Sequence, residues 1–107
     1  MALNSVMNDT KWNELRHAMY ALGHPWPRWR TRDTENGHVS DWDGEWYYHF
    51  NEGGYSTIEW VEIQSNSNDQ LELILARLRA IHVPGEPSPH GFIVYGYTQP
   101  GQVVDYL

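Results

Sequence analysis

Residues 38–63 read HVSDWDGEWYYHFNEGGYSTIEWVEI, and they place three of the six tryptophans and three of the seven tyrosines among carboxylates. Aromatic side chains favour strands, and the run Asn-Glu-Gly-Gly predicts a turn between a strand at 45–50 and a strand at 56–63. Side chains alternate along a strand, so one face of the first would carry Glu45, Tyr47 and His49. Such a sheet shows rings and negative charge together, which is typical of a surface that binds a basic partner.

Two segments that flank this stretch have helical periodicity. The first runs from Asp9 or Thr10 to about Leu22, before Gly23, and its apolar stripe consists of Trp12, Leu15, Met19 and Leu22. The second runs from Ser67, which forms a capping-box pattern with Gln70, to about Ile81. Its apolar stripe consists of Leu71, Ile74, Leu75 and Leu78.

Between the first helix and residue 38, three arginines alternate with other residues in a predicted strand. Arg28, Arg30 and Arg32 would share one face of that strand. The dipeptide Asn-Gly at 36–37 predicts a hairpin turn into a strand that begins near His38. We expect the arginines to pair with carboxylates across the sheet, such as Asp33, Glu45 or Glu59.

The remaining elements complete an α+β fold class. Residues 83–91 form a proline-rich loop, and segments 92–98 and 103–106 predict a final hairpin. The predicted order is α-β-β-β-α-β-β, with a mostly antiparallel sheet of about five strands and two helices packed on it. We expect residues 1–8 to be a flexible N-terminal segment and residues 9–107 to be a single α+β domain.

Composition narrows the classes of function. Fourteen acidic and seven basic residues give a net charge of -7, which would repel phosphate backbones and argues against nucleic-acid binding. The chain has no cysteine, no apolar run of membrane-spanning length and no signal-peptide pattern at its start. We therefore expect a cytoplasmic protein with no membrane partner, and a basic protein becomes the better candidate partner.

The motifs of catalysis and metal binding are missing or incomplete. Asp41, Asp43 and Glu45 resemble the opening of a calcium loop, but Trp46 stands at the sixth position, where that loop requires glycine. The six histidines form no His-x-x-x-His pair, and the chain has no nucleophile elbow or phosphate-binding glycine loop. We expect no metal, no cofactor and no enzymatic activity.

The acidic turn at the start of the aromatic stretch is the predicted binding site. Side chains on a turn reach solvent, and Trp42 could serve as an anchor there. The candidate partner-binding residues are Asp41, Trp42, Asp43, Glu45, Tyr47 and His49. We expect Trp12, Trp46 and Trp60 in the core, and Trp26, Trp29 and Trp42 partly exposed. Exposed tryptophans also stack on sugars, so a carbohydrate-binding module is the alternative function.

Three parts of the chain carry a resemblance to known proteins. The segment 10–16, the block SDWDGEWYYHF at 40–50, and the end formed by 83–86 with 95–97 resemble a small uncharacterised bacterial family. The chain is also similar to the small acidic immunity proteins encoded beside contact-dependent and polymorphic toxins. That similarity implies a single α+β domain that neutralises a cognate toxin protein by occluding its active site, with no catalytic residues of its own.

Overall fold

The computed structural model describes residues 2–107. This part of the chain contains two helices, α1 (Asp9–Ala21) and α2 (Asn68–Ile81). Its six strands are β1 (Asn4–Ser5), β2 (Arg28–Asp33), β3 (Ile58–Gln64), β4 (Gly85–Pro87), β5 (Gly91–Tyr95) and β6 (Tyr97–Thr98). The order β2-β3-β5-β4 forms one antiparallel sheet, and β1 pairs with β6 in a second. The predicted α+β class is confirmed.

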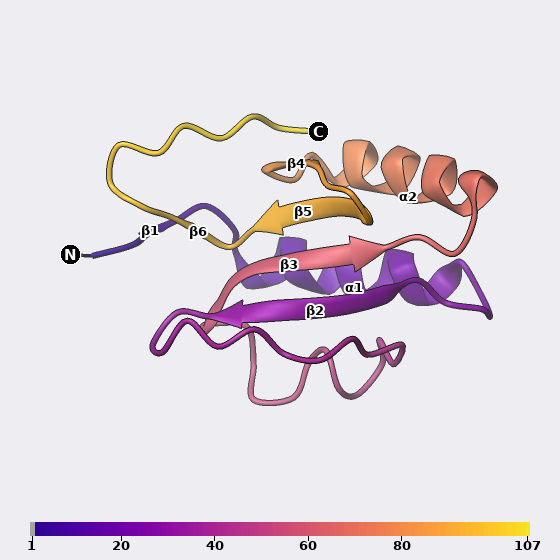
Figure 1. Cartoon of the computed structure of the whole chain (residues 1–107), viewed down its shortest axis with the longest axis horizontal. Helices are drawn as coiled ribbons and strands as arrows, with labels where there is room; N and C mark the ends of the chain where they lie inside the picture. Colours follow the sequence, from indigo (N-terminus) through magenta and orange to yellow (C-terminus); the bar gives the residue numbers. More distant parts are fainter. Residues whose placement is uncertain (1) are drawn as a thin grey trace.

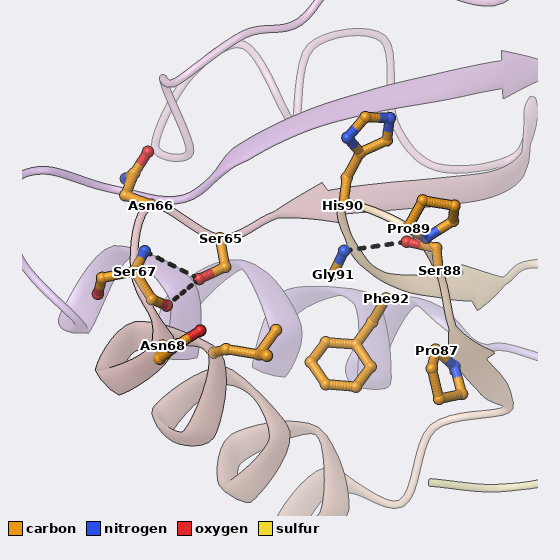
Figure 2. A pocket seen from close by; sticks show the side chains of 11 residues that line it. Ser65, Asn66, Ser67, Asn68, Pro87, Ser88, Pro89, His90, Gly91 and Phe92 are labelled. Carbon is orange, nitrogen blue, oxygen red and sulfur yellow. Dashed lines mark hydrogen bonds between the residues drawn. The ribbon is translucent and has the colours of Figure 1, made fainter.

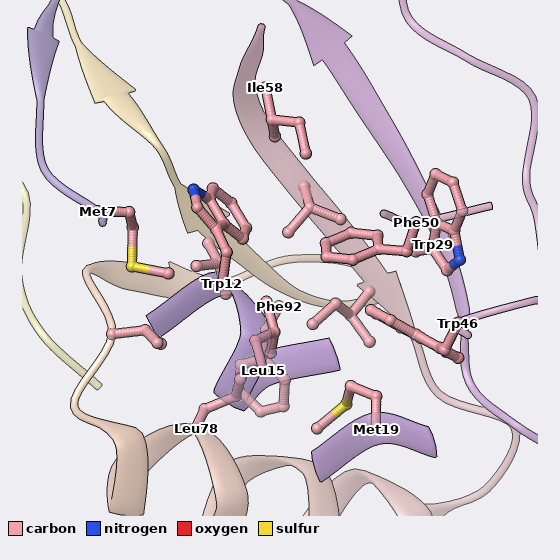
Figure 3. Packing of buried hydrophobic residues seen from close by; sticks show 14 of the residues in the cluster. Met7, Trp12, Leu15, Met19, Trp29, Trp46, Phe50, Ile58, Leu78 and Phe92 are labelled. Carbon is pink, nitrogen blue, oxygen red and sulfur yellow. The ribbon is translucent and has the colours of Figure 1, made fainter. Parts of the chain in front are cut away.

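A single apolar core joins the helices to one face of the larger sheet. α1 passes behind the sheet, and α2 lies beside it next to β4 and β5 (Figure 1). Figure 3 shows side chains from α1 and α2 meeting those of the strands. The fully buried members from the sheet and helices include Leu15, Met19, Val61, Ile63, Ile74, Leu78 and Val94. Neither helix described in residues 2–107 has the length and apolar character needed to cross a bilayer.

Local side-chain bonds determine where both helices begin. Asn8 Oδ1 accepts from Lys11 N at 2.8 Å, so the cap of α1 lies just before the predicted Asp9 or Thr10. Ser67 Oγ caps α2 by accepting from Gln70 N at 3.1 Å, as the capping-box pattern predicts. The Gln70 side chain accepts from Asn66 N at 2.7 Å rather than from Ser67 N. The predicted spans of both helices are therefore confirmed to within two residues.

The prediction of a strand at 45–50 is wrong. The segment forms consecutive turns, in which the Glu45 carboxylate accepts from the backbone N–H groups of Tyr47 (2.9 Å), Tyr48 (2.6 Å) and His49 (2.7 Å). These are donors that a strand would give to its neighbour. Trp46 and Phe50 are four residues apart, and their rings meet in the core with centroids 4.8 Å apart (Figure 3). A strand would also place both side chains on one face, but about 13 Å apart, because it rises about 3.3 Å per residue.

Two predicted hairpins are only partly formed. Residues 38–43 run along the free edge of β2 without becoming a strand, and they make isolated bridges at Arg32–Val39 and Trp29–Asp43. Segment 103–106, predicted as a strand, makes one bridge, between Pro84 and Tyr106. Both segments satisfy backbone groups at the edges of the sheet, which limits edge-to-edge association with other chains. Two strands, rather than three, therefore lie between the helices.

The N-terminal segment packs on the fold over the residues that are described. Met1 lies outside the described residues. β1 pairs with β6 in register Asn4–Thr98 and Ser5–Tyr97. Met7 is buried in the core, and Val6 N donates to Gly96 O at 2.9 Å. Residues 2–8 thus contribute a strand and a core side chain, where the sequence predicts a flexible segment.

Candidate interaction surface

The six predicted binding residues do not gather at one place. Asp41 is exposed on the loop that follows the edge of β2. Trp42 folds onto the face of the sheet that points away from the helices, beside Arg30. Asp43, Glu45 and His49 bond to one another and to the backbone, whereas Tyr47 contacts α1. The structure therefore separates the predicted site into four environments.

The carboxylates of Asp43 and Glu45 organise the turn at 45–50. Asp43 Oδ1 accepts from Glu45 N at 2.8 Å, and Asp43 Oδ2 lies 2.9 Å from His49 Nδ1. Burial alone would raise the pKa of Glu45, but hydrogen bonds from the N–H groups of His49, Tyr48 and Tyr47 lower it below its ordinary value. Glu45 thus holds backbone donors only, whereas Asp43 holds one backbone donor and the His49 side chain.

The imidazole of His49 is the cationic partner in this turn. Its hydrogen bond to Asp43, followed by the charge of Asp43, raises the pKa of His49 above 6.5. Slight desolvation opposes the rise, and the charges of Glu45 and Glu52 add to it. The ion pair with Asp43 balances the charge that His49 gains on protonation.

Trp42 covers an ion pair on the outer face of the sheet. Arg30 Nη2 and Nε lie 2.8 and 3.0 Å from Glu62 Oε1, and the Glu62 side chain is only 5% exposed. The Arg30 guanidinium carbon lies 4.4 Å from the centroid of the Trp42 ring, and the His90 ring makes a T-shaped contact with Trp42 at a centroid distance of 5.5 Å. This arrangement is structural, since the ring keeps water from a nearly buried carboxylate.

The arginines of β2 partly follow the predicted pairing. Arg32 Nε lies 3.5 Å from Glu59 Oε1, as the alternation predicts. Arg30 pairs with Glu62, which faces it directly across β2 and β3, rather than with Asp33 or Glu45. The reason is register, because cross-strand neighbours are set by tertiary pairing.

Exposed rings gather where α1 ends and the 45–50 turn approaches it. We call this the tyrosine surface, and it consists of Tyr20, Trp26, Tyr47 and Tyr48. Tyr20 stacks on Trp26 at 5.6 Å and meets Tyr47 at 5.4 Å, and Tyr47 meets Tyr48 at 4.7 Å. Tyr20 and Tyr47 are each 44% exposed and Tyr48 is 73% exposed.

A buried arginine fixes this surface from below. Arg16 Nε donates to Trp46 O at 3.1 Å and to Tyr47 O at 2.9 Å, and Nη2 also donates to Tyr47 O. The guanidinium carbon lies 4.8 Å from the centroid of the Tyr47 ring. Arg16 thus ties α1 to the turn and holds the Tyr47 ring in place before any partner arrives.

Of the tyrosine surface, only Tyr47 belongs to the predicted site. Tyr20 lies one residue after Met19 and off the apolar stripe of α1, so an aromatic side chain on the exposed helix face was the available signal. A strand at 45–50 would place Tyr48 on the opposite face from Tyr47, together with Trp46 and Phe50. Trp29 was expected to be partly exposed but is buried, and its Nε1 donates to Glu45 O at 2.9 Å.

A groove of about 390 Å³ lies between the start of α2 and the proline loop (Figure 2). Phe92 and Leu71 form its apolar floor. Its polar groups bond largely to one another: Gly91 N donates to Ser88 Oγ at 3.1 Å, and Ser67 N donates to Ser65 Oγ at 3.2 Å. Across residues 2–107 no three His, Cys, Asp or Glu side chains are grouped to hold a metal ion. The groove therefore presents no evident chemistry.

Comparisons with known proteins place the chain in a family without assigning an activity. A search of curated proteins found no match, and a search of solved structures found none either. The match to a family model covers residues 1–101 and does not connect the chain to immunity proteins or toxin systems. The model is described as a family of unknown function (DUF6678), and because it covers most of the 107 residues, the chain belongs to that family.

Proposed function

We propose that this protein is a protein-binding inhibitor of the immunity type, which binds a cognate toxin in the cytoplasm and covers the toxin's active site. The observation that carries the proposal is the tyrosine surface, where three tyrosines are 44–73% exposed and in mutual contact. Tyrosine and tryptophan are the common anchors of protein interfaces, because they bury large areas with little loss of side-chain freedom.

The packing of these rings favours a protein partner over a sugar. A sugar stacks on an open, flat ring face. Tyr20 and Trp26 lie nearly parallel, at 12°, and so cover one face of each other, and Arg16 covers one face of Tyr47. Each of these three rings thus has one face occupied within the molecule, and Tyr47 and Tyr48 meet at 74°, so the surface is no flat platform for a sugar. The carbohydrate-binding alternative is correspondingly less well supported.

Charge supports a basic partner. Of the fourteen acidic side chains, Glu59, Glu62 and Asp43 form ion pairs within residues 2–107. The many remaining carboxylates leave the surface with excess negative charge. Such a surface accelerates association with a cationic cleft and disfavours like-charged competitors.

The mechanism we propose is occlusion by a preformed surface. Arg16 and Glu45 hold the turn that presents Tyr47 and Tyr48, so little conformational entropy is lost when the partner binds. The rings would fill apolar recesses beside the toxin's cleft, and the surrounding carboxylates would face its cationic groups. No residue of this chain takes part in chemistry.

Surface-binding kinetics with the product of the adjacent gene test the proposal. The wild-type chain should bind that product. Tyr47→Ala should speed dissociation by about 30-fold or more if Tyr47 is an anchor worth at least 2 kcal/mol. Tyr106→Ala is a matched control, because Tyr106 is also half exposed but contacts Lys11, at the opposite end of α1. Equal dissociation rates for the two variants would show that the interface lies elsewhere on the surface. Absence of binding by the wild type would contradict the proposed function.

A sugar titration tests the alternative on the same protein. Trp26 is the tryptophan of the tyrosine surface, so a sugar that stacks there should quench or shift tryptophan emission, and Trp26→Phe should weaken that response. A saturable response to neutral oligosaccharides, together with no binding of the adjacent gene product, would favour the carbohydrate module.

A further inference from the structure

Tyr48 stands out within the tyrosine surface because it is the most exposed of its rings. Its ring meets that of Tyr47 at 74° with centroids 4.7 Å apart, so the two form a corner that opens to solvent. Arg16 occupies the Tyr47 side of this pair from within the molecule. The open side of the corner has no cation over it within the described residues 2–107.

Two carboxylates belong to the chain segment that carries this corner. Glu45 accepts from Tyr48 N, and its donors are neutral N–H groups, so the bonds hold the carboxylate without neutralising its charge. Glu52 is exposed at the end of the same run of turns, and its N–H donates to His49 O at 3.3 Å. The nearby cation, His49, is already paired with Asp43. The corner is therefore an aromatic surface under negative potential.

Elsewhere in this chain the same kind of surface holds a cation. Arg30 stacks on Trp42 at 4.4 Å while its guanidinium bonds to Glu62. The ring and the carboxylate thus act on one guanidinium together. Arginine suits such a site better than lysine, because its planar group stacks on a ring and presents several donors to a carboxylate at once.

We propose that Tyr48, with Glu45 and Glu52, binds an arginine side chain of the partner protein, stacked on the ring and bonded to one of the carboxylates. This inference rests on the proposed function, because the arginine is the partner's. It names the group that the tyrosine surface recognises. Of the predicted acidic residues it keeps Glu45, and it replaces Asp41 and Asp43 by Glu52.

Short peptides provide a probe that does not require the partner. Acetylated, amidated Arg-Gly-Arg, Lys-Gly-Lys and Gln-Gly-Gln are titrated into the ¹⁵N-labelled full chain, and amide shifts are followed by NMR. The arginine peptide should shift the amides of residues 45–52 in a saturable manner, and the glutamine peptide should not. Tyr48→Leu should weaken arginine binding about two- to five-fold, the size of an exposed cation–π contact.

Two further variants test whether the Glu52 carboxylate contributes and whether another exposed tyrosine does. Glu52→Gln should weaken the arginine peptide without changing the fold, since the side chain is exposed. Tyr106→Leu, at the Lys11 end of α1, should leave the titration unchanged. If the lysine peptide binds as tightly as the arginine peptide and Tyr48→Leu affects neither, simple charge attraction explains the shifts and the inference is wrong.

The inference and the proposed function can fail separately. If the adjacent gene product binds and Tyr47→Ala speeds its release, but the arginine peptide shifts no amide in residues 45–52, the arginine site is rejected and the proposed function stands. If the peptide binds as expected but the adjacent gene product does not, the arginine site stands and the toxin-inhibitor proposal fails.

Discussion

At the residue scale, Trp42 shows how a predicted binding anchor can instead be a structural cover. An exposed tryptophan beside two aspartates suggests recognition. In the structure the ring contacts both Arg30 and His90, and it stacks on the arginine that pairs with the nearly buried Glu62. Removing it would hydrate a carboxylate that now lies in a low-dielectric environment, so its first effect should be on stability rather than on binding.

We predict that Trp42→Ala lowers the free energy of unfolding by about 1–3 kcal/mol, because a half-buried ring and its cation–π contact are lost. Urea denaturation followed by circular dichroism measures this. Trp42→Phe keeps a ring over Arg30 and should recover part of the loss. An unchanged midpoint for Trp42→Ala, with full loss of partner binding, would instead restore Trp42 as an anchor.

The turn at 45–50 should depend on pH through two side chains. The pKa of His49 is raised in the folded state, so its pairing with Asp43 stabilises the turn below about pH 6.5 and is lost as the pH rises through the raised value. The pKa of Glu45 is lowered, so its contribution is present above about 4.5 and is lost as the pH falls through the lowered value. NMR titration should show Asp43→Asn moving the pKa of His49 back toward 6.5. A His49 pKa that does not move in this variant would exclude the Asp43 pair as the cause.

At the element scale, the two helices follow from local sequence. Their apolar stripes repeat with the helical period, and Asn8 and Ser67 supply side-chain caps within three residues of the groups that they satisfy. The 45–50 segment also carries a local signal, since Glu45 accepts from the N–H groups of Tyr47, Tyr48 and His49, but that signal competes with an aromatic run. Its aromatic alternation fits a strand equally well until Arg16, about thirty residues earlier in the chain, bonds to Trp46 O and Tyr47 O.

The residues of the apolar stripe of α2 should contribute unequally to the free energy of unfolding. Leu78 is fully buried, whereas Leu75 is half-buried at the edge of the core. We expect Leu78→Ala to destabilise the fold by about 2–5 kcal/mol and Leu75→Ala by clearly less, because the partly exposed site leaves a smaller cavity. Urea denaturation of both variants measures the difference, and equal losses would contradict this assignment of the helix face.

At the scale of the whole molecule, charge should control how quickly a partner arrives. Reversing Asp43 or Glu45 would break the turn, so Asp41 and Glu52, which are exposed, are the better positions to test. We predict that Asp41→Lys combined with Glu52→Lys slows association with the adjacent gene product, because attraction to a basic partner is reduced. The association rate should also depend less on salt, since that attraction is what salt screens, beyond about 10 Å at 0.1 M.

Asn13→Asp is a control for that experiment, because it changes the net charge in the opposite direction. It adds negative charge on the exposed face of α1, next to Tyr55 OH, and should not slow association. Association rates at two salt concentrations provide the readout, with the fold checked by circular dichroism. If the charge-reversed pair associates at the wild-type rate at both salt concentrations, the steering charges lie elsewhere on the surface.

The sequence by itself determined the α+β class, the spans of α1 and α2, the strands β2 and β3, and the excess of negative charge. Each of these depends on periodicity, on caps within a few residues, or on composition, all of which are local properties. Tertiary structure decided between the local turn bonds of Glu45 and the strand preference of the aromatic run at 45–50. It alone decided that Trp29 is buried and that Tyr20, Trp26, Tyr47 and Tyr48 meet. The physical reason is that these outcomes depend on contacts such as Arg16 with Tyr47, between residues 31 positions apart, whose energies exceed the weak local preference of an aromatic run for a strand.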